Sequence, residues 1–142
     1  MNRQRVERWL TPPTAGDGVL IVDDTGFAQQ GKASVGVARQ GSGTLGKVGT
    51  RQVAVNCHSV ERTRAWPVAT RLDLPQDGAD DTARRTTAKM PEEIPFRTEP
   101  EIALALGDQT RAWGVRHARV VADADDGDNP NSLAGLEQRR QR

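Results

Sequence analysis

The fold is decided by residues 20–40, which read LIVDDTGFAQQGKASVGVARQ and directly follow Val19. Four consecutive apolar residues, 19–22, run straight into two adjacent carboxylates, Asp23 and Asp24. A continuous apolar run of this length predicts a strand that is buried on both faces of a sheet. Carboxylates at the end of such a strand are costly to desolvate unless something pairs with them, and a divalent metal ion is one such partner.

Apolar residues recur along the rest of the chain with the two periods that distinguish strands from helices. Alternation predicts strands, whereas a helical period that begins at Pro100 and stops before Gly114 predicts a helix. Strands followed by helix, strand and helix fit an α/β sheet with a mixed beginning. The predicted strands are 19–24, 33–39, 52–58, 68–74 and 119–122; the predicted helices are 3–10, 100–113 and a last one from 133; and 41–49 and 75–89 are predicted loops, the second of them with a short exposed helix as the alternative.

Composition limits the classes of protein that the chain can represent. With 142 residues it forms one domain at most, and with 35% hydrophobic residues and no tyrosine we expect a thin core. The net charge of +1 creates no global field that would attract DNA. The single Cys57 excludes an internal disulfide and favours the cytosol. The sequence contains no apolar run long enough to span a membrane and no apolar signal core for secretion. We therefore expect a cytoplasmic protein with no membrane partner.

Three patterns suggest other kinds of site and fail on spacing. The acidic loop 123–128 lacks the ligand spacing and the final Glu of a calcium loop. Residues 41–46 match G-x-G-x-x-G, but a strand follows where a dinucleotide site needs a helix. His58 and His117 are too isolated to indicate zinc. None of the three therefore predicts a function.

A series of short motifs carries a family resemblance. The motifs are VDDTGF (22–27), GKASVGVARQ (31–40), GTLGKV (43–48), QVAV (52–55), RLDLP (71–75), MPEEIPFRTEPEIAL (90–104), WGV (113–115) and VVADADDGDN (120–129). Taken together, they resemble in content and order the catalytic domain of bacterial insertion-sequence transposases of the DDE superfamily, over about residues 19–136. The resemblance implies a partial ribonuclease-H-like mixed sheet with flanking helices. It also implies an incomplete catalytic domain at 19–142 after a short, flexible N-terminal segment at 1–18.

The resemblance assigns the carboxylates a chemical role. Such enzymes cleave and join DNA with Mg²⁺ (or Mn²⁺), and their first two acids lie on strand one and just past strand four. The matching positions are Asp24 and Asp123, as catalytic residues and metal ligands. The family pattern places the acid directly before Thr25, which favours Asp24 over Asp23. Asp-Thr-Gly is also ordinary turn chemistry after a strand, which is the alternative for this pair.

Departures from the family pattern bear on activity. A third acid, a Glu on a later helix, is expected well beyond Asp123, and Glu137 lies too close to serve. We therefore interpret the chain as a truncated, inactive transposase fragment. The resemblance implies the DNA ends of a mobile element as its partner. One alternative is a non-catalytic fragment that binds DNA or a full-length transposase and regulates it. Two others are an active fragment that obtains its Glu from a separate chain, and a chain that does not fold stably.

Overall fold

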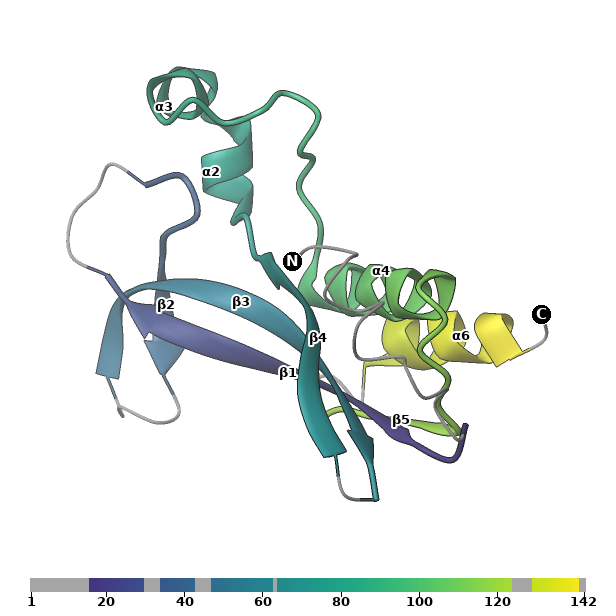
Figure 1. The fold of residues 1–142 in the computed structure, drawn as a ribbon. Coiled ribbons are helices and arrows are strands. Elements are labelled where there is room, and N and C mark those ends of the chain that lie inside the picture. The colour runs from purple at the N-terminus through teal and green to yellow at the C-terminus, as the bar shows by residue number, and fades with distance from the viewer. Residues whose placement is uncertain (1–15, 30–33, 43–46, 63, 124–128, 141–142) are drawn as a thin grey trace. The chain divides into compact units, whose positions relative to one another are not determined.

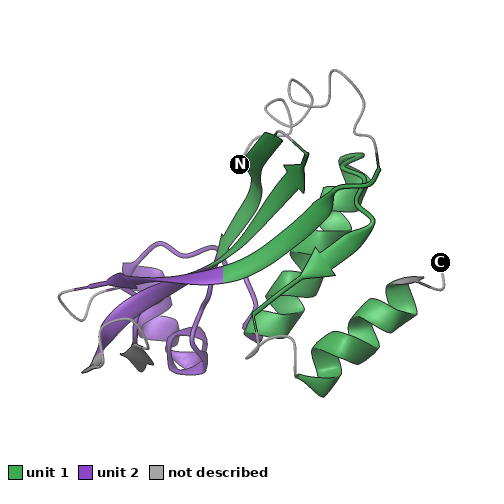
Figure 2. Cartoon of the chain, turned by 90° about the horizontal axis from the view of Figure 1, so that it is seen from below, with its two compact units in different colours: residues 1–23, 55–71, 99–142 green, residues 24–54, 72–98 purple. Residues whose placement is uncertain are grey.

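The computed structural model describes residues 16–29, 34–42, 47–62, 64–123 and 129–140. The chain divides into two compact units, coloured separately in Figure 2. Unit 1 comprises residues 1–23, 55–71 and 99–142, and unit 2 comprises residues 24–54 and 72–98. Across the described ranges, no helix has both the length and the apolar character that crossing a bilayer requires.

The strands form one mixed sheet, labelled in Figure 1. The sheet order is β2-β3-β1-β5, and β4 pairs with β3. Strand β5 is parallel to β1, whereas β2 and β3 are antiparallel, and helices flank the sheet. This confirms the predicted α/β class with a ribonuclease-H-like mixed sheet. The strands are β1 (Val19–Ala28), β2 (Ala38–Ser42), β3 (Lys47–Glu61), β4 (Arg64–Leu72) and β5 (Arg119–Val121).

Unit 1 is built around the packing of helix α4 (Glu99–Ala112) on strands β1, β3 and β4. Leu20 from β1 is fully buried, and it clusters with Ile102 and Leu106, which follow one another at the four-residue spacing of one helix face. Thr110 continues that face, and its hydroxyl donates to the Leu106 carbonyl at 2.7 Å. The buried polar group is therefore satisfied inside the helix. Helix α6 (Pro130–Arg140) follows β5 and is held to α4 by the Asp108–Arg139 pair at 2.7 Å.

Unit 2 contains the β2–β3 hairpin and two short helices, α2 (Gln76–Asp80) and α3 (Thr82–Thr87). Asp81 begins α3, because its carboxylate accepts the Arg84 backbone N–H at 2.9 Å. The guanidinium of Arg85 donates to the carbonyls of Pro91 (3.0 Å) and Ile94 (3.0 Å). These bonds from Arg85 hold the irregular segment after α3, which belongs to no helix or strand.

The second predicted strand, 33–39, is wrong in position. The strand in this region is β2 at Ala38–Ser42, and residues 35–36 form a turn. This segment belongs to unit 2, where the Val35 carbonyl lies against Gly78 of α2. Gly36 and Val37 are both buried and Val35 is partly buried, so the alternating valines do not correspond to the alternating burial of a strand. Strand β1 is also longer than predicted, since it continues to Ala28.

The helical predictions are closer to the structure. The helix predicted at 100–113 is α4, and Gly114, with φ +80°, supplies the left-handed stop. The last predicted helix is α6, which begins at Pro130. The segment 75–89 contains the short helices α2 and α3, in agreement with the helical alternative. The helix predicted at 3–10 lies outside the described residues.

Two helical glycines allow a matched test of this packing. A Cβ at Gly78 would lie 2.1 Å from the Val35 carbonyl oxygen, whereas a Cβ at Gly107 of α4 would meet nothing within 4 Å. We expect Gly78→Ala to lower the free energy of unfolding by about 1–3 kcal/mol through overpacking. Gly107→Ala should raise it by about 0.5–1 kcal/mol, because alanine loses less backbone entropy in a helix.

Urea denaturation followed by circular dichroism measures both changes. A Gly78→Ala variant as stable as the parent chain would contradict the close approach of α2 to Val35.

Candidate metal centre

The acidic residues of the candidate site are positioned by the parallel pairing of β1 with β5. The register joins Val19 to Arg119 and Ile21 to Val121. Because β1 and β5 are parallel and in this register, their carboxyl ends lie at the same edge of the sheet. Asp23 follows Ile21 by two residues and Asp123 follows Val121 by two, so the continued register sets these acids opposite one another. Pairing thus unites residues that are distant in the sequence.

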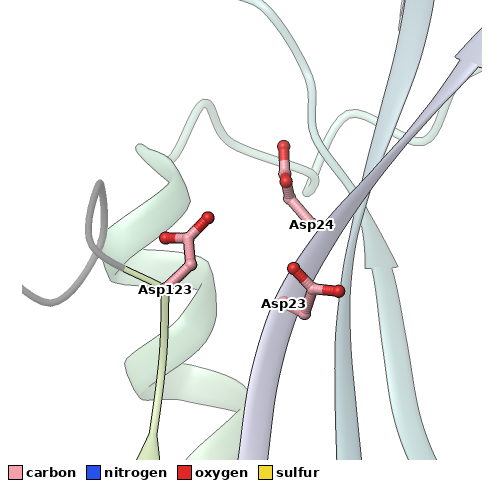
Figure 3. Close-up of side chains that lie close together, drawn as sticks. All are labelled: Asp23, Asp24 and Asp123. Atoms are coloured by element: carbon pink, nitrogen blue, oxygen red, sulfur yellow. The ribbon is translucent and has the colours of Figure 1, made fainter. Parts of the chain in front are cut away.

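Three carboxylates gather at this end of the strands (Figure 3). One oxygen from each of Asp23, Asp24 and Asp123 lies within 4.8 Å of the oxygens of the other two. Asp23 and Asp123 both belong to unit 1 and are exposed, and Asp24 is the next residue of β1.

The structure brings together the two residues that the sequence singled out, Asp24 and Asp123. It adds Asp23 to the same group. Successive side chains of a strand leave opposite faces, yet one oxygen of each aspartate reaches the cluster. The geometry therefore does not choose between Asp23 and Asp24, and the role of Asp24 and Asp123 as metal ligands stays a prediction.

The donor set consists of carboxylate oxygens alone. Oxygen ligands suit Mg²⁺ and similar hard divalent cations, whereas zinc in proteins takes mainly nitrogen and sulfur. Cys57 is buried and contacts the Thr110 hydroxyl at 3.7 Å. Burial raises the pKa of the Cys57 thiol, against a smaller opposite effect of the Thr110 contact, so it stays protonated. The residues of the cluster thus fit a divalent metal of the magnesium type.

The strands that carry the acids are anchored by the hydrophobic core of unit 1. Leu20 and Val22 of β1 are buried in the main core, and Val120 of β5 packs against it. The Ala118 N–H donates to the Gly18 carbonyl at 2.8 Å, which fixes the entry into β5. Burial of apolar neighbours on both strands anchors the backbone that carries the carboxylates.

Other acidic residues considered from the sequence do not join this group. Asp125, Asp126 and Asp128 lie outside the described residues. Glu137 is exposed on α6 and is not a member of the cluster. Sequence reasoning assigned no role to Arg111, Arg116 and His117, which line a hollow in unit 1. They lie within seven residues of one another in the sequence, but no motif spacing identifies them as a site.

Comparisons with known proteins agree with this arrangement. The family model described as DDE superfamily endonuclease matches residues 2–142. The chain is 28% identical over 106 residues to a protein of Microchaete diplosiphon named "Probable transposase for insertion sequence element IS701". That match covers 75% of this chain and 25% of the relative, so the chain spans about a quarter of the relative's length. No solved structure matches.

Mutual repulsion within the cluster is directly measurable. Two unit charges 4.8 Å apart repel by about 0.9 kcal/mol in water. In EDTA we therefore expect Asp24→Asn and Asp23→Asn each to raise the free energy of unfolding by about 1–2 kcal/mol, because each relieves two such repulsions. Thermal unfolding measures the change, with Glu137→Gln as the control that removes an acid outside the cluster. An Asn variant less stable than the parent chain would contradict the repulsion.

Proposed function

We propose, since this chain belongs to the DDE superfamily endonuclease family, that Asp24 and Asp123 hold a divalent metal ion for phosphodiester cleavage and strand transfer on DNA. The substrate is the end of a mobile element, in keeping with the relative named as an insertion-sequence transposase. The observation that carries the proposal is the meeting of three carboxylates within 4.8 Å at the ends of two parallel strands.

The metal that suits this donor set is Mg²⁺, with Mn²⁺ as a substitute of similar ligand preference. When bound, it polarises a phosphoryl oxygen and lowers the pKa of a coordinated water. Asp24 and Asp123 serve as its ligands, and Asp23 adds negative charge within reach of the same ion. The strand ends keep these oxygens converged before the ion arrives, so little ordering is needed on binding.

Charge explains why a metal ion is needed for DNA to approach the three carboxylates. Three carboxylates within 4.8 Å repel a phosphodiester, which is itself an anion. The chain as a whole has a net charge of +1, too little to overcome this repulsion locally. A divalent cation between the acids offsets it where the substrate must lie.

We further propose that the 142-residue chain by itself is catalytically silent. The three carboxylates converge on a single point, so they can hold one ion loosely but do not readily fix a second. In-line phosphoryl transfer in two-metal sites uses two ions about 4 Å apart. Silence here means loss of turnover with metal binding retained.

Metal binding is the primary test of the proposed site. The chain should bind Mn²⁺ in titrations followed by electron paramagnetic resonance. Asp24→Asn and Asp123→Asn should each weaken binding by about tenfold or more, a change of ~1.4 kcal/mol. The matched Glu137→Gln control should leave binding unchanged. Equal affinity in the parent chain and both Asp variants would refute the site, and a larger loss in Asp23→Asn than in Asp24→Asn would reassign the ligand.

Turnover is tested separately on duplex DNA that carries the ends of an insertion element. With Mg²⁺ or Mn²⁺, we expect no nicking and no joining. Cleavage that disappears in Asp24→Asn would contradict silence and support the site. Cleavage that survives Asp24→Asn and Asp123→Asn would place the activity elsewhere. DNA binding without any metal binding would favour the non-catalytic regulatory alternative.

A further inference from the structure

The guanidinium of Arg51 lies over strand β1, on the part of that strand that belongs to unit 2. The N–H of Gln29, directly after β1, donates to the Thr50 carbonyl of β3 at 2.9 Å, so Arg51 enters the sheet beside the end of β1. Its side chain then runs back along β1. A Cβ on Gly26 would lie 3.0 Å from Arg51 Nη1 and 3.2 Å from its Cδ. The guanidinium therefore extends over Gly26, in the direction of Asp24.

The absence of a side chain at Gly26 is what leaves room for this arrangement. A contact at 3.0 Å is tighter than ordinary van der Waals contact, so any larger residue would push the Arg51 side chain aside. Alternate residues of a strand share one face, and Asp24 and Gly26 are such a pair. Their side-chain positions are about 7 Å apart, which is twice the rise per residue. The guanidinium thus stands one side-chain position from a carboxylate of the proposed metal site.

Arg51 is held there without an acidic partner among the described residues. Its Nε is shut off from solvent and has no hydrogen-bond partner in the described part of the chain. No ion pair joins Arg51 to a described carboxylate, since the pairs Asp17–Arg62 and Asp108–Arg139 use other cations. A buried, unbonded N–H of a cation is costly, and an anion bound to the same guanidinium offsets part of that cost.

A phosphate group is the anion that suits this guanidinium. Two guanidinium nitrogens match two phosphate oxygens in a planar fork, and hydrogen bonds between charged groups are about twice as strong as neutral ones. Arg51 stays charged at every physiological pH. A phosphate that lies at the acids is within reach of Arg51, because only about 7 Å separates the side-chain positions of Asp24 and Gly26.

We propose that Arg51 binds a phosphate group of the DNA that approaches the acidic cluster. The proposal rests on the proposed function for its choice of DNA as the ligand. Arg51 holds the sugar-phosphate backbone in place and takes no part in proton transfer, because its guanidinium does not lose a proton in proteins. Gly26 acts only through Arg51 and is a positioning residue.

Duplex binding at two salt concentrations tests the proposal. In Mn²⁺, Arg51→Gln should weaken binding to a short DNA duplex and reduce the salt slope by about one. Between 50 and 200 mM salt, the loss of affinity should then be smaller by ~3.5-fold than in the parent chain. Arg51→Lys keeps the charge and should keep the slope. Arg119→Gln is the matched control, because Arg119 is exposed and pairs with Val19, at the far end of β1 from the acids.

Gly26→Ala reaches the same guanidinium from the other strand. The added Cβ displaces the Arg51 side chain, so duplex binding should weaken although no charge is lost. Once Arg51→Gln has removed the guanidinium, adding Gly26→Ala should cause little further loss, and full additivity would contradict a shared action. If circular dichroism shows that Arg51→Gln does not fold, unchanged duplex binding in a folded Gly26→Ala chain overturns the proposal.

Four outcomes separate the proposal from its alternatives. A loss of affinity and slope that is confined to Arg51→Gln supports it. Equal effects of Arg51→Gln and Arg119→Gln overturn it in favour of diffuse surface charge, and a parent chain that binds no duplex overturns it as well. Phosphorus nuclear magnetic resonance follows inorganic phosphate. If Arg51→Gln weakens the binding of inorganic phosphate and leaves duplex binding unchanged, DNA is not the ligand.

Failure of this proposal and failure of the proposed function give different results. Arg51→Gln should not weaken Mn²⁺ binding, because it removes a positive charge from the surroundings of the ion. If Mn²⁺ binding depends on Asp24 and Asp123 while Arg51→Gln binds duplex as the control does, the metal site stands and the role of Arg51 falls. If duplex binding in EDTA depends on Arg51 while no Asp variant alters Mn²⁺ binding, the phosphate contact stands and the metal site falls.

Discussion

The parallel pairing of β1 with β5 is the constraint on which the rest of the structure depends. In parallel strands equivalent ends lie together, so this single pairing sets Asp23 beside Asp123. Parallel neighbours need a long crossover, and here the connection runs through β2, β3, β4 and the helices before β5, with α4 as its last element. The burial of Leu20 against α4 therefore supports the acidic cluster, although Leu20 is not a member of it.

Local patterns predicted those elements that bury a continuous apolar surface. The run that contains Leu20 predicted β1, and the spacing of Ile102 and Leu106 predicted α4, because burial imposes these patterns directly. The same reasoning misplaced the second strand. Val35 and Val37 alternate in the sequence as apolar residues of a strand would, but the segment forms a turn, and the consecutive residues Gly36 and Val37 are both buried. Sequence period alone does not show whether an alternating segment pairs in a sheet.

The acidic cluster and Arg51 differ in what the sequence contains. Resemblance to a family pointed to Asp24 and Asp123, and the strand register then explains why they meet. It did not decide between Asp24 and Asp23, because adjacent residues at a strand end can both turn toward one point. Arg51 had no sequence signal at all. Its place over β1 depends on a glycine two residues after Asp24 and on the pairing of β3 with β1, and only the folded chain unites these segments.

The three converging carboxylates have a consequence for how the proposed metal ion would act on the fold. Their oxygens lie within 4.8 Å of one another, so their like charges repel when no ion is bound. The parallel pairing of β1 with β5 is what unites the acids, so only the folded chain would offer the ion all three of them. Under the proposed function, metal binding would therefore offset the repulsion and, by mass action, stabilise the folded chain.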